Sequence, residues 1–133
     1  MKNVVKGGKR KTAIATAALR PGKGVIRVNG MLLDYYEPEL YRMKIREPLL
    51  LAGDVASGVD IDVKIHGGGF NSRAEAARLA IANALVDYAK TDKLKETFLK
   101  YNRNMLISDV RRKESAKPNR HGQARSKVQK SYR

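Results

Sequence analysis

The sequence predicts an α/β (α+β) body, with a mixed sheet packed by helices, followed by an extended basic segment. Three observations carry this prediction. Residues 59–65 (VDIDVKI) alternate between apolar and charged side chains, as in a strand with one buried and one wet face. Residues 73–89 are rich in alanine and place apolar side chains at helical spacing. From Asp109 onward no periodicity is sustained and hydrophobic residues are few. A wet sheet face favours antiparallel or mixed pairing.

A β-hairpin is expected near the start of the body. Residues 12–20 (TAIATAALR) form a moderately apolar segment that ends at PGKG, where Pro21 and Gly22 suit a tight turn. Residues 25–28 (VIRV) then return as a second strand, and Asn29-Gly30 marks the next turn. We therefore expect the two segments to pair directly with each other.

Two short helices are predicted within residues 31–53, which are rich in Leu, Met and Tyr. Pro38 and Pro48 each fit the first turn of a helix, where the missing N–H costs little. Gly53 has the position of a helix stop.

The long helix over 73–89 has candidate N-caps at Asn71 or Ser72, and Ser72 and Glu75 have the spacing of a capping box. Its many alanines suggest a close approach to the sheet. A final helix is expected over 92–101. The predicted packing residues are Ala74, Ala77, Ile81, Ala84, Leu85 and Tyr88 in the first helix and Leu94, Phe98, Leu99 and Tyr101 in the second.

The formal net charge of +15 is concentrated at the two ends of the chain. Residues 1–12 contribute +5, residues 109–133 contribute +7, and the 96 residues between them contribute only +3. A nearly balanced body with two basic ends points to a polyanionic partner. The absence of cysteine excludes disulfides and thiolate chemistry. No signal-peptide apolar region and no membrane-length apolar stretch occur, so we expect a cytoplasmic protein without membrane contact.

No active site, metal site or cofactor site is expected. The triple glycine Gly67, Gly68 and Gly69 precedes a helix but lacks the fingerprint of a nucleotide site. The two histidines lie far apart in sequence, and Asp60 and Asp62 read as ordinary solvated carboxylates on a wet strand face. The glycines more readily let the chain turn sharply and bring backbone close to a neighbouring group. A backbone contact to an RNA phosphate is the functional alternative.

The basic ends suit RNA. The C-terminal cations are spaced among Ser, Gln, Asn and Gly, so the segment can follow a phosphate backbone without forming a helix, and alone it should be disordered. Tyr132 can stack on a base or sugar. Composition alone allows a general nucleic-acid chaperone almost equally well. The candidate RNA-binding cations are Lys9, Arg10, Lys11, Arg111, Arg112, Lys113, Lys117, Arg120, Arg125 and Lys127.

Four motifs, in order along nearly the whole chain, resemble the universal small-subunit ribosomal protein nine family. They are GKRKTAIATAALRPGKGVIRVNG, LLDYYEPE, HGGGFNSRAEAARLAIANALVDY and LISDVRRKESAKPNRHGQARSKVQKSYR. The ending KSYR is similar to the archaeal and eukaryotic branch. Such a set argues against the general chaperone. In this family a Gln is common where Arg73 stands, so Arg73 is a further candidate for a phosphate contact.

The resemblance implies the fold called the ribosomal-protein-five second domain, with a left-handed βαβ crossover. The change of pattern at Asp109 divides the chain into a body over residues 1–108 and a tail over 109–133, and the resemblance implies that this tail binds RNA. The expected partners are small-subunit rRNA and neighbouring proteins of the subunit head, with no small-molecule substrate. In the family the tail reaches the decoding region, where its end contacts the anticodon stem-loop of peptidyl-site tRNA. The positions that correspond to this end are Lys130, Ser131, Tyr132 and Arg133.

Overall fold

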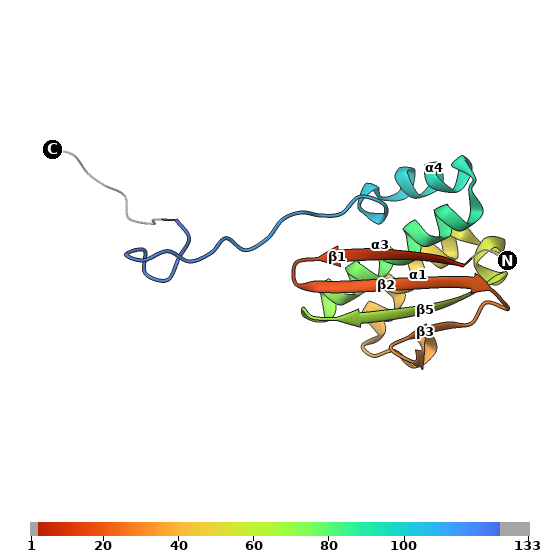
Figure 1. The fold of residues 1–133 in the computed structure, drawn as a ribbon, viewed down its shortest axis with the longest axis horizontal. Coiled ribbons are helices and arrows are strands. Elements are labelled where there is room, and N and C mark those ends of the chain that lie inside the picture. The colour runs from red at the N-terminus through yellow and green to blue at the C-terminus, as the bar shows by residue number, and fades with distance from the viewer. Residues whose placement is uncertain (1–2, 126–133) are drawn as a thin grey trace.

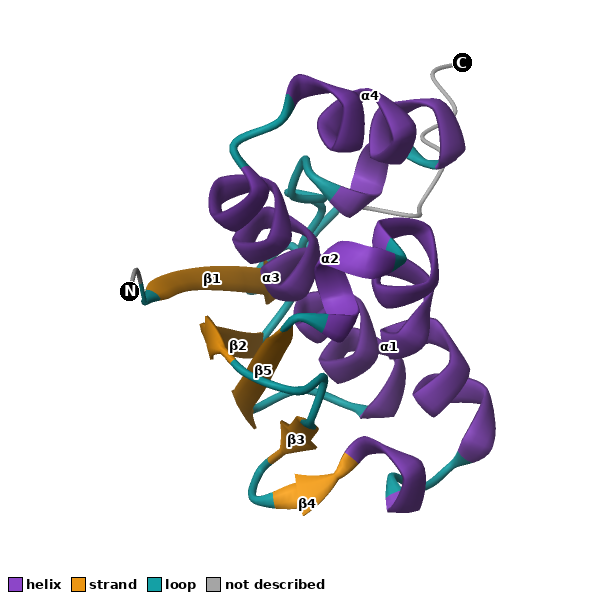
Figure 2. Ribbon diagram, turned by 90° about the vertical axis from the view of Figure 1, so that its right-hand side faces the viewer, coloured by secondary structure: helices purple, strands orange, loops and turns teal. Residues whose placement is uncertain are grey.

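The computed structural model describes residues 3–125, which fold as one mixed sheet with helices on a single face, followed by an extended segment (Figures 1 and 2). Within these residues the sheet has the strand order β1-β2-β5-β3-β4. The strands are β1 (Val4–Arg10), β2 (Ala13–Pro21), β3 (Ile26–Val28), β4 (Met31–Leu32) and β5 (Val59–His66). Of the pairings among these five strands, β3–β5 is parallel and the other three are antiparallel. The predicted mixed sheet packed by helices is confirmed.

Strand β5 lies at the centre of the sheet and confirms the alternation read from the sequence. Val59, Ile61, Val63 and Ile65 are buried, whereas the residues between them face the uncovered side. Asn29 extends the parallel pair because its side-chain oxygen accepts from the Ile65 N–H at 2.8 Å. Its backbone N–H donates to the Val63 carbonyl at 2.8 Å.

The predicted hairpin between residues 12–20 and 25–28 is wrong, because β5 lies between β2 and β3. Instead, β2 pairs with β1 across a turn at Lys11-Thr12. The sequence pattern did not predict strand β1. The Asp60 carboxylate accepts from the backbone N–H groups of Lys23 and Val25, at 2.9 and 3.0 Å. These bonds hold the PGKG loop over the start of β5. The loop therefore crosses β5, which lies between β2 and β3 in the sheet.

Residues 31–53 contain one long helix and not the two expected. After a short 3-10 turn at Leu33–Tyr35, α1 runs from Glu39 to Ala52 with Pro38 as its N-cap and Pro48 inside it. Pro48 is fully buried, so its ring packs into the core at a position where the helix gives up one hydrogen bond. Gly53 ends the helix as predicted, and its N–H donates to the Leu49 carbonyl at 3.1 Å. A four-residue helix, α2 (Asp54–Ser57), then leads into β5.

The central helix α3 (Phe70–Ala89) begins earlier than predicted, with Gly69 as its N-cap. Neither Asn71 nor Ser72 caps it, and Glu75 is bound to other elements, so the predicted capping box is wrong. Its predicted apolar stripe is buried, with Tyr88 only partly so, but α3 is buried well beyond that stripe because it is packed between the sheet, α1 and α4. The alanines allow this close packing, as expected.

The chain leaves the body after the last helical elements. Helix α4 (Asp92–Tyr101) matches its predicted range and buries Leu94 and Phe98, whereas Leu99 and Tyr101 are exposed. A 3-10 turn at Arg103–Met105 follows, and Met105 is fully buried. Residues 106–125 form neither helix nor strand and run away from the body on the side of the β1–β2 turn (Figure 1).

The contact between β1 and α3 requires a glycine. A Cβ built on Gly8 would lie 2.2 Å from the Ala76 carbonyl oxygen, which is backbone and cannot move aside cheaply. On the opposite face of the same strand, a Cβ on Gly7 would meet no atom nearer than 3.9 Å. The close approach of β1 to α3 therefore depends on the absence of a side chain at Gly8.

We expect Gly8→Ala to lower the free energy of unfolding by about 2–3 kcal/mol, because α3 must shift away from β1. Gly7→Ala is the matched control, and it should change stability by less than about 0.5 kcal/mol. Urea denaturation of the two variants at neutral pH provides the measurement. Equal effects of the two substitutions would show that the β1–α3 distance is not constrained as described.

Candidate nucleic-acid interface

Arg10, the last residue of β1, connects the body to the start of the C-terminal segment. Its Nε donates to a Glu75 carboxylate oxygen at 2.7 Å, and one terminal nitrogen donates to the Arg111 carbonyl at 3.2 Å. Its other terminal nitrogen lies 3.3 Å from an Asp109 carboxylate oxygen. The Arg10 side chain is only 13% exposed. This candidate RNA contact therefore holds the protein itself together.

Glu75 is the meeting point of three elements. Besides Arg10 from β1, it accepts from the Lys44 ammonium of α1 at 3.0 Å, and Lys44 also donates to Asn71 of α3 at 2.9 Å. Burial alone would raise the pKa of Glu75, but the hydrogen bonds from Lys44 and Arg10 outweigh it and hold that pKa below its usual range. Glu75 therefore stays ionised and binds β1, α1 and α3 to one another.

Asp109 fixes the point at which the chain leaves the body. Its carboxylate accepts from the Arg111 side chain at 2.7–3.1 Å and from the Arg111 backbone N–H at 3.0 Å. These hydrogen bonds, together with the nearby Arg10 guanidinium, hold the pKa of Asp109 well below its usual range. The Arg111 side chain is still 80% exposed, so its outer edge faces solvent. The start of the tail is thus anchored by a carboxylate clamped between two arginines.

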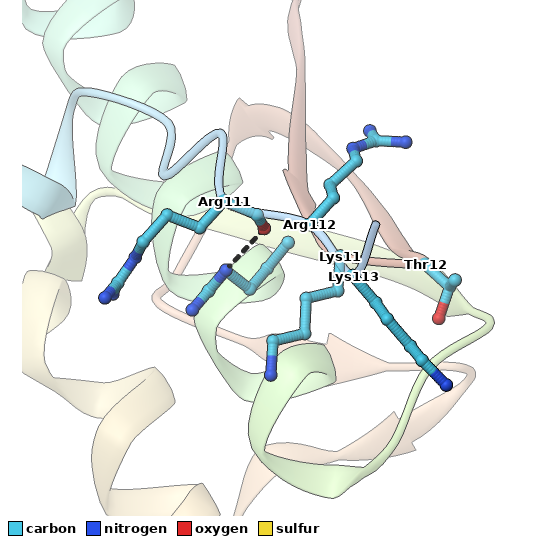
Figure 3. A pocket seen from close by; sticks show the side chains of 6 residues that line it. Lys11, Thr12, Arg111, Arg112 and Lys113 are labelled. Carbon is cyan, nitrogen blue, oxygen red and sulfur yellow. Dashed lines mark hydrogen bonds between the residues drawn. The ribbon is translucent and has the colours of Figure 1, made fainter. Parts of the chain in front are cut away.

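A cationic concave surface lies where the β1–β2 turn meets the C-terminal segment, and it encloses a hollow of about 750 Å³. Figure 3 shows side chains from both segments fanning outward around it. Its lining residues are Arg10, Lys11, Thr12, Arg111, Arg112 and Lys113. Among residues 3–125, Lys11, Arg112 and Lys113 are exposed and make no ion pair. A phosphate can bind these three cationic side chains without displacing an existing acidic partner.

The glycine loop packs directly beneath this turn. Gly67 and Gly68 have φ angles of +72° and +65°, and a Cβ on Gly67 would lie 2.5 Å from the Thr12 carbonyl oxygen. The expectation that these glycines allow a sharp turn and a close backbone approach is confirmed. Gly69 has no neighbour within 4 Å of a built Cβ. Arg73 Nε donates to the Gly67 carbonyl at 2.9 Å, so Arg73 steadies the loop. A phosphate contact at this loop stays a prediction.

The C-terminal segment contains one local loop. Arg125 pairs with Glu114 through two hydrogen bonds of 2.6 and 2.9 Å, and the Lys117 N–H donates to the Gln123 carbonyl at 3.1 Å. Lys117 and Arg120 are exposed, and neither side chain has an acidic partner in the part of the chain that is described. The remaining candidates lie outside the described residues: Lys127, Lys130, Ser131, Tyr132 and Arg133.

Side chains considered for other chemistry have structural roles or are dispersed. Asp60 is not an ordinary solvated carboxylate, because the hydrogen bonds from the Val25 and Lys23 backbone hold its pKa below the usual range. Asp62 pairs with Arg20 at 3.1 Å. Residues 3–125 contain no group of three His, Cys, Asp or Glu side chains that could hold a metal. No helix in the same range is long and apolar enough to cross a bilayer.

The sequence analysis did not identify Glu75 and Asp109 as partners of Arg10. Arg10 lies 65 positions from Glu75, and the Arg10–Arg111 contact spans 101 positions. Local sequence carries no sign of such contacts. The nearest signal was the position of Glu75 three residues after Ser72, and it pointed to a cap that does not form.

Comparison with known proteins gives consistent results. Residues 8–133 match the family described as Ribosomal protein S9/S16. The chain is 49% identical over its 133 residues to the small ribosomal subunit protein uS9 of Desulfurococcus amylolyticus and covers 94% of that protein. It is 47% identical to the small ribosomal subunit protein uS9 of Methanothrix thermoacetophila, with both chains covered in full.

We expect Glu75→Gln to lower the free energy of unfolding by about 1–2 kcal/mol at pH 7, because Arg10 and Lys44 lose a charged partner in a partly buried site. The folded-state pKa of Glu75 lies below its unfolded value, so its stabilisation is present above the unfolded pKa. That stabilisation is lost as pH falls through the folded pKa. The gap between wild type and variant should therefore shrink below about pH 4. Denaturant titrations at several pH values measure it.

Asp87→Asn is the control for this substitution, because it breaks an exposed ion pair with Lys6. Its expected cost is below about 0.5 kcal/mol. A Glu75→Gln effect that is equally small, or that does not change with pH, would contradict the role assigned to the Glu75 carboxylate.

Proposed function

This chain belongs to the ribosomal protein S9/S16 family and is a structural component of the small ribosomal subunit, and from that premise we propose how it binds rRNA. The resemblance read from the four motifs is thereby confirmed, and the expected location is the cytoplasmic ribosome. The proposed rRNA-binding centre is the cationic concave surface. The observation that carries it is that Lys11, Arg112 and Lys113 surround one hollow without an acidic partner in residues 3–125.

We assign residues 1–108 to the globular body and residues 109–133 to the RNA-binding tail. The boundary is supported by Arg10, which binds the Asp109 carboxylate and the Arg111 carbonyl and so anchors the start of the tail to the body. Exposed cations at Lys117 and Arg120 continue the charge outward. Arg125, Lys127 and the loop at Gly67–Gly69 with Arg73 complete the proposed set of rRNA contacts. The neighbours in the assembled subunit are other proteins of its head.

The fold name and the crossover handedness belong to the same proposal. We assign the body to the ribosomal-protein-five second-domain fold, with a left-handed crossover from β3 through α1 to β5. The supporting observation is that β3 and β5 are adjacent and parallel, with Ile26 opposite Ile61, and are connected through α1 and α2.

The end of the tail is proposed to contact peptidyl-site tRNA in the decoding region. The residues are Lys130, Ser131, Tyr132 and Arg133, which correspond to the family's tRNA-contacting end. Cationic groups can meet phosphates of the anticodon stem-loop, and the Tyr132 ring can stack on a base or sugar. The contribution is electrostatic and positional, without catalysis.

We expect replacement of Lys11, Arg112 and Lys113 by alanine to weaken binding to a small-subunit rRNA transcript and to reduce its salt dependence. Each lost phosphate contact should make the slope of log K against log salt shallower by about 0.7–0.9. The triple variant should therefore lose about 2–3 from a wild-type slope near −4 to −5, the value for about six phosphate contacts. Filter binding between about 50 and 300 mM salt gives both slopes.

The control is the triple alanine variant of Lys93, Lys95 and Lys100 on α4, which removes the same charge from an exposed helix. It should keep the wild-type slope. Equal slopes for the two triple variants would mean that charge, and not the concave surface, governs binding.

We expect deletion of Tyr132 and Arg133 to leave incorporation into small subunits nearly intact. Binding of tRNA at the peptidyl site should weaken by about 1 kcal/mol, the scale of one stack or one charged contact. Sedimentation of subunits and tRNA binding to purified subunits measure the two effects separately. Loss of incorporation would instead identify the tail end as an assembly element.

A further inference from the structure

The face of the sheet opposite the helices is uncovered among residues 3–125 (Figures 1 and 2). Strand pairing aligns its side chains in rows that cross β1, β2 and β5. One row contains Lys9, Ile14 and His66, and the next contains Gly7, Thr16 and Lys64. All of these residues are exposed. We call Ile14, Thr16, Lys64 and His66 the sheet patch, with Lys9 at its edge.

Charge is segregated along this open face. At the end away from the β1–β2 turn, Asp62 pairs with Arg20 and lies 3.8 Å from Arg27, so the charges there are matched. The two cationic side chains nearest the turn, Lys9 and Lys64, have no acidic partner within residues 3–125. The open face therefore carries its unmatched positive charge at the end that borders the cationic concave surface.

The side chains between these cations are short and include few apolar groups. Gly7 has no side chain, Thr16 is small, and Ile14 is 36% exposed. Such a surface has Ile14 as its one large aliphatic side chain and lacks the Tyr, Trp and Phe side chains that are enriched at the centre of most protein–protein interfaces. It does suit a sugar–phosphate backbone. A ribose can pack on Ile14, the Thr16 hydroxyl can hydrogen-bond to a 2′-OH, and lysine can meet a phosphate.

We propose that the sheet patch is a second rRNA-binding surface, which contacts the sugar–phosphate backbone without reading bases. This inference rests on the proposed rRNA-binding function and extends it to a face that none of the tail residues occupies. The patch borders the Lys11-Thr12 turn, and that turn itself lines the cationic concave surface. One rRNA region can therefore contact both. Ile14, Thr16, Lys64 and His66 have no role in the first surface.

The experiment compares Ile14→Glu and Lys64→Ala with Lys23→Ala in the full chain, using a small-subunit rRNA transcript in filter binding. Lys64→Ala should weaken binding several-fold at about 0.1 M salt and make the salt slope shallower by about 0.7–0.9. Ile14→Glu removes no cation but places an acid in the patch, and it should weaken binding about tenfold or more by repelling phosphate. Lys23 is exposed in the loop between β2 and β3, at the end of the sheet away from the β1–β2 turn, so Lys23→Ala should leave the slope unchanged.

Thermal denaturation of each variant checks that it remains folded, and Lys64→Arg should restore binding if the charge is what matters. A second readout uses assembled subunits. The Lys64 amine should be protected from acylation there and should react in the free protein, whereas a reactive Lys64 in subunits would overturn the proposal.

The outcomes separate this inference from the function on which it rests. Wild-type binding by Lys64→Ala and Ile14→Glu, with weakened binding by the Lys11, Arg112 and Lys113 triple variant, would overturn the sheet patch alone. Wild-type binding by the triple variant as well would overturn both. Equal losses for Lys23→Ala and Lys64→Ala would show that any body lysine serves, which also removes the patch.

Discussion

The Arg10 guanidinium, held between the Glu75 and Asp109 carboxylates, is the interaction on which the arrangement of the interface depends. A partly buried arginine must have charged partners, since its desolvation would otherwise be costly. By taking one partner from α3 and one from the chain after α4, Arg10 brings the end of β1, the central helix and the start of the tail to one place. Because Arg10 holds Asp109 and Arg111 beside the β1–β2 turn, the exposed side chains of Lys11, Arg112 and Lys113 are brought close together.

The basic residues of this protein therefore divide into two kinds. Arg10 and Arg78 are used internally, and Arg78 pairs with Glu47 at 2.6 Å while almost fully buried. Others, such as Lys11 and Arg112, have no internal partner in residues 3–125. The formal charge of +15 counts both kinds alike. A charge total thus indicates the class of partner, but only the pairing of each cation shows which ones are free to meet it.

Local pattern and tertiary context account for what could and could not be predicted. The alternation of residues 59–65, the α4 range and the stop at Gly53 follow from interactions within a few residues, and all three are confirmed. The insertion of β5 between β2 and β3 is a tertiary arrangement, and it is accompanied by hydrogen bonds to Asp60 from Lys23 and Val25, which lie 37 and 35 positions earlier in the chain. Pro48 inside α1 is tolerated because its burial offsets a lost hydrogen bond. Lys11, Arg112 and Arg10 were predicted alike as RNA contacts, because the sequence does not show that Arg10 alone of the three has acidic partners.

The uneven charge of the open sheet face also bears on the rate at which the protein meets its partner. Matched charges at one end and unmatched cations at the other make the open sheet face most positive beside the β1–β2 turn. The field of a polyanion favours orientations in which this end faces it before any contact forms. The effect acts over roughly 10 Å at about 0.1 M salt. Productive encounters then become a larger share of all collisions, although no bond has yet been made.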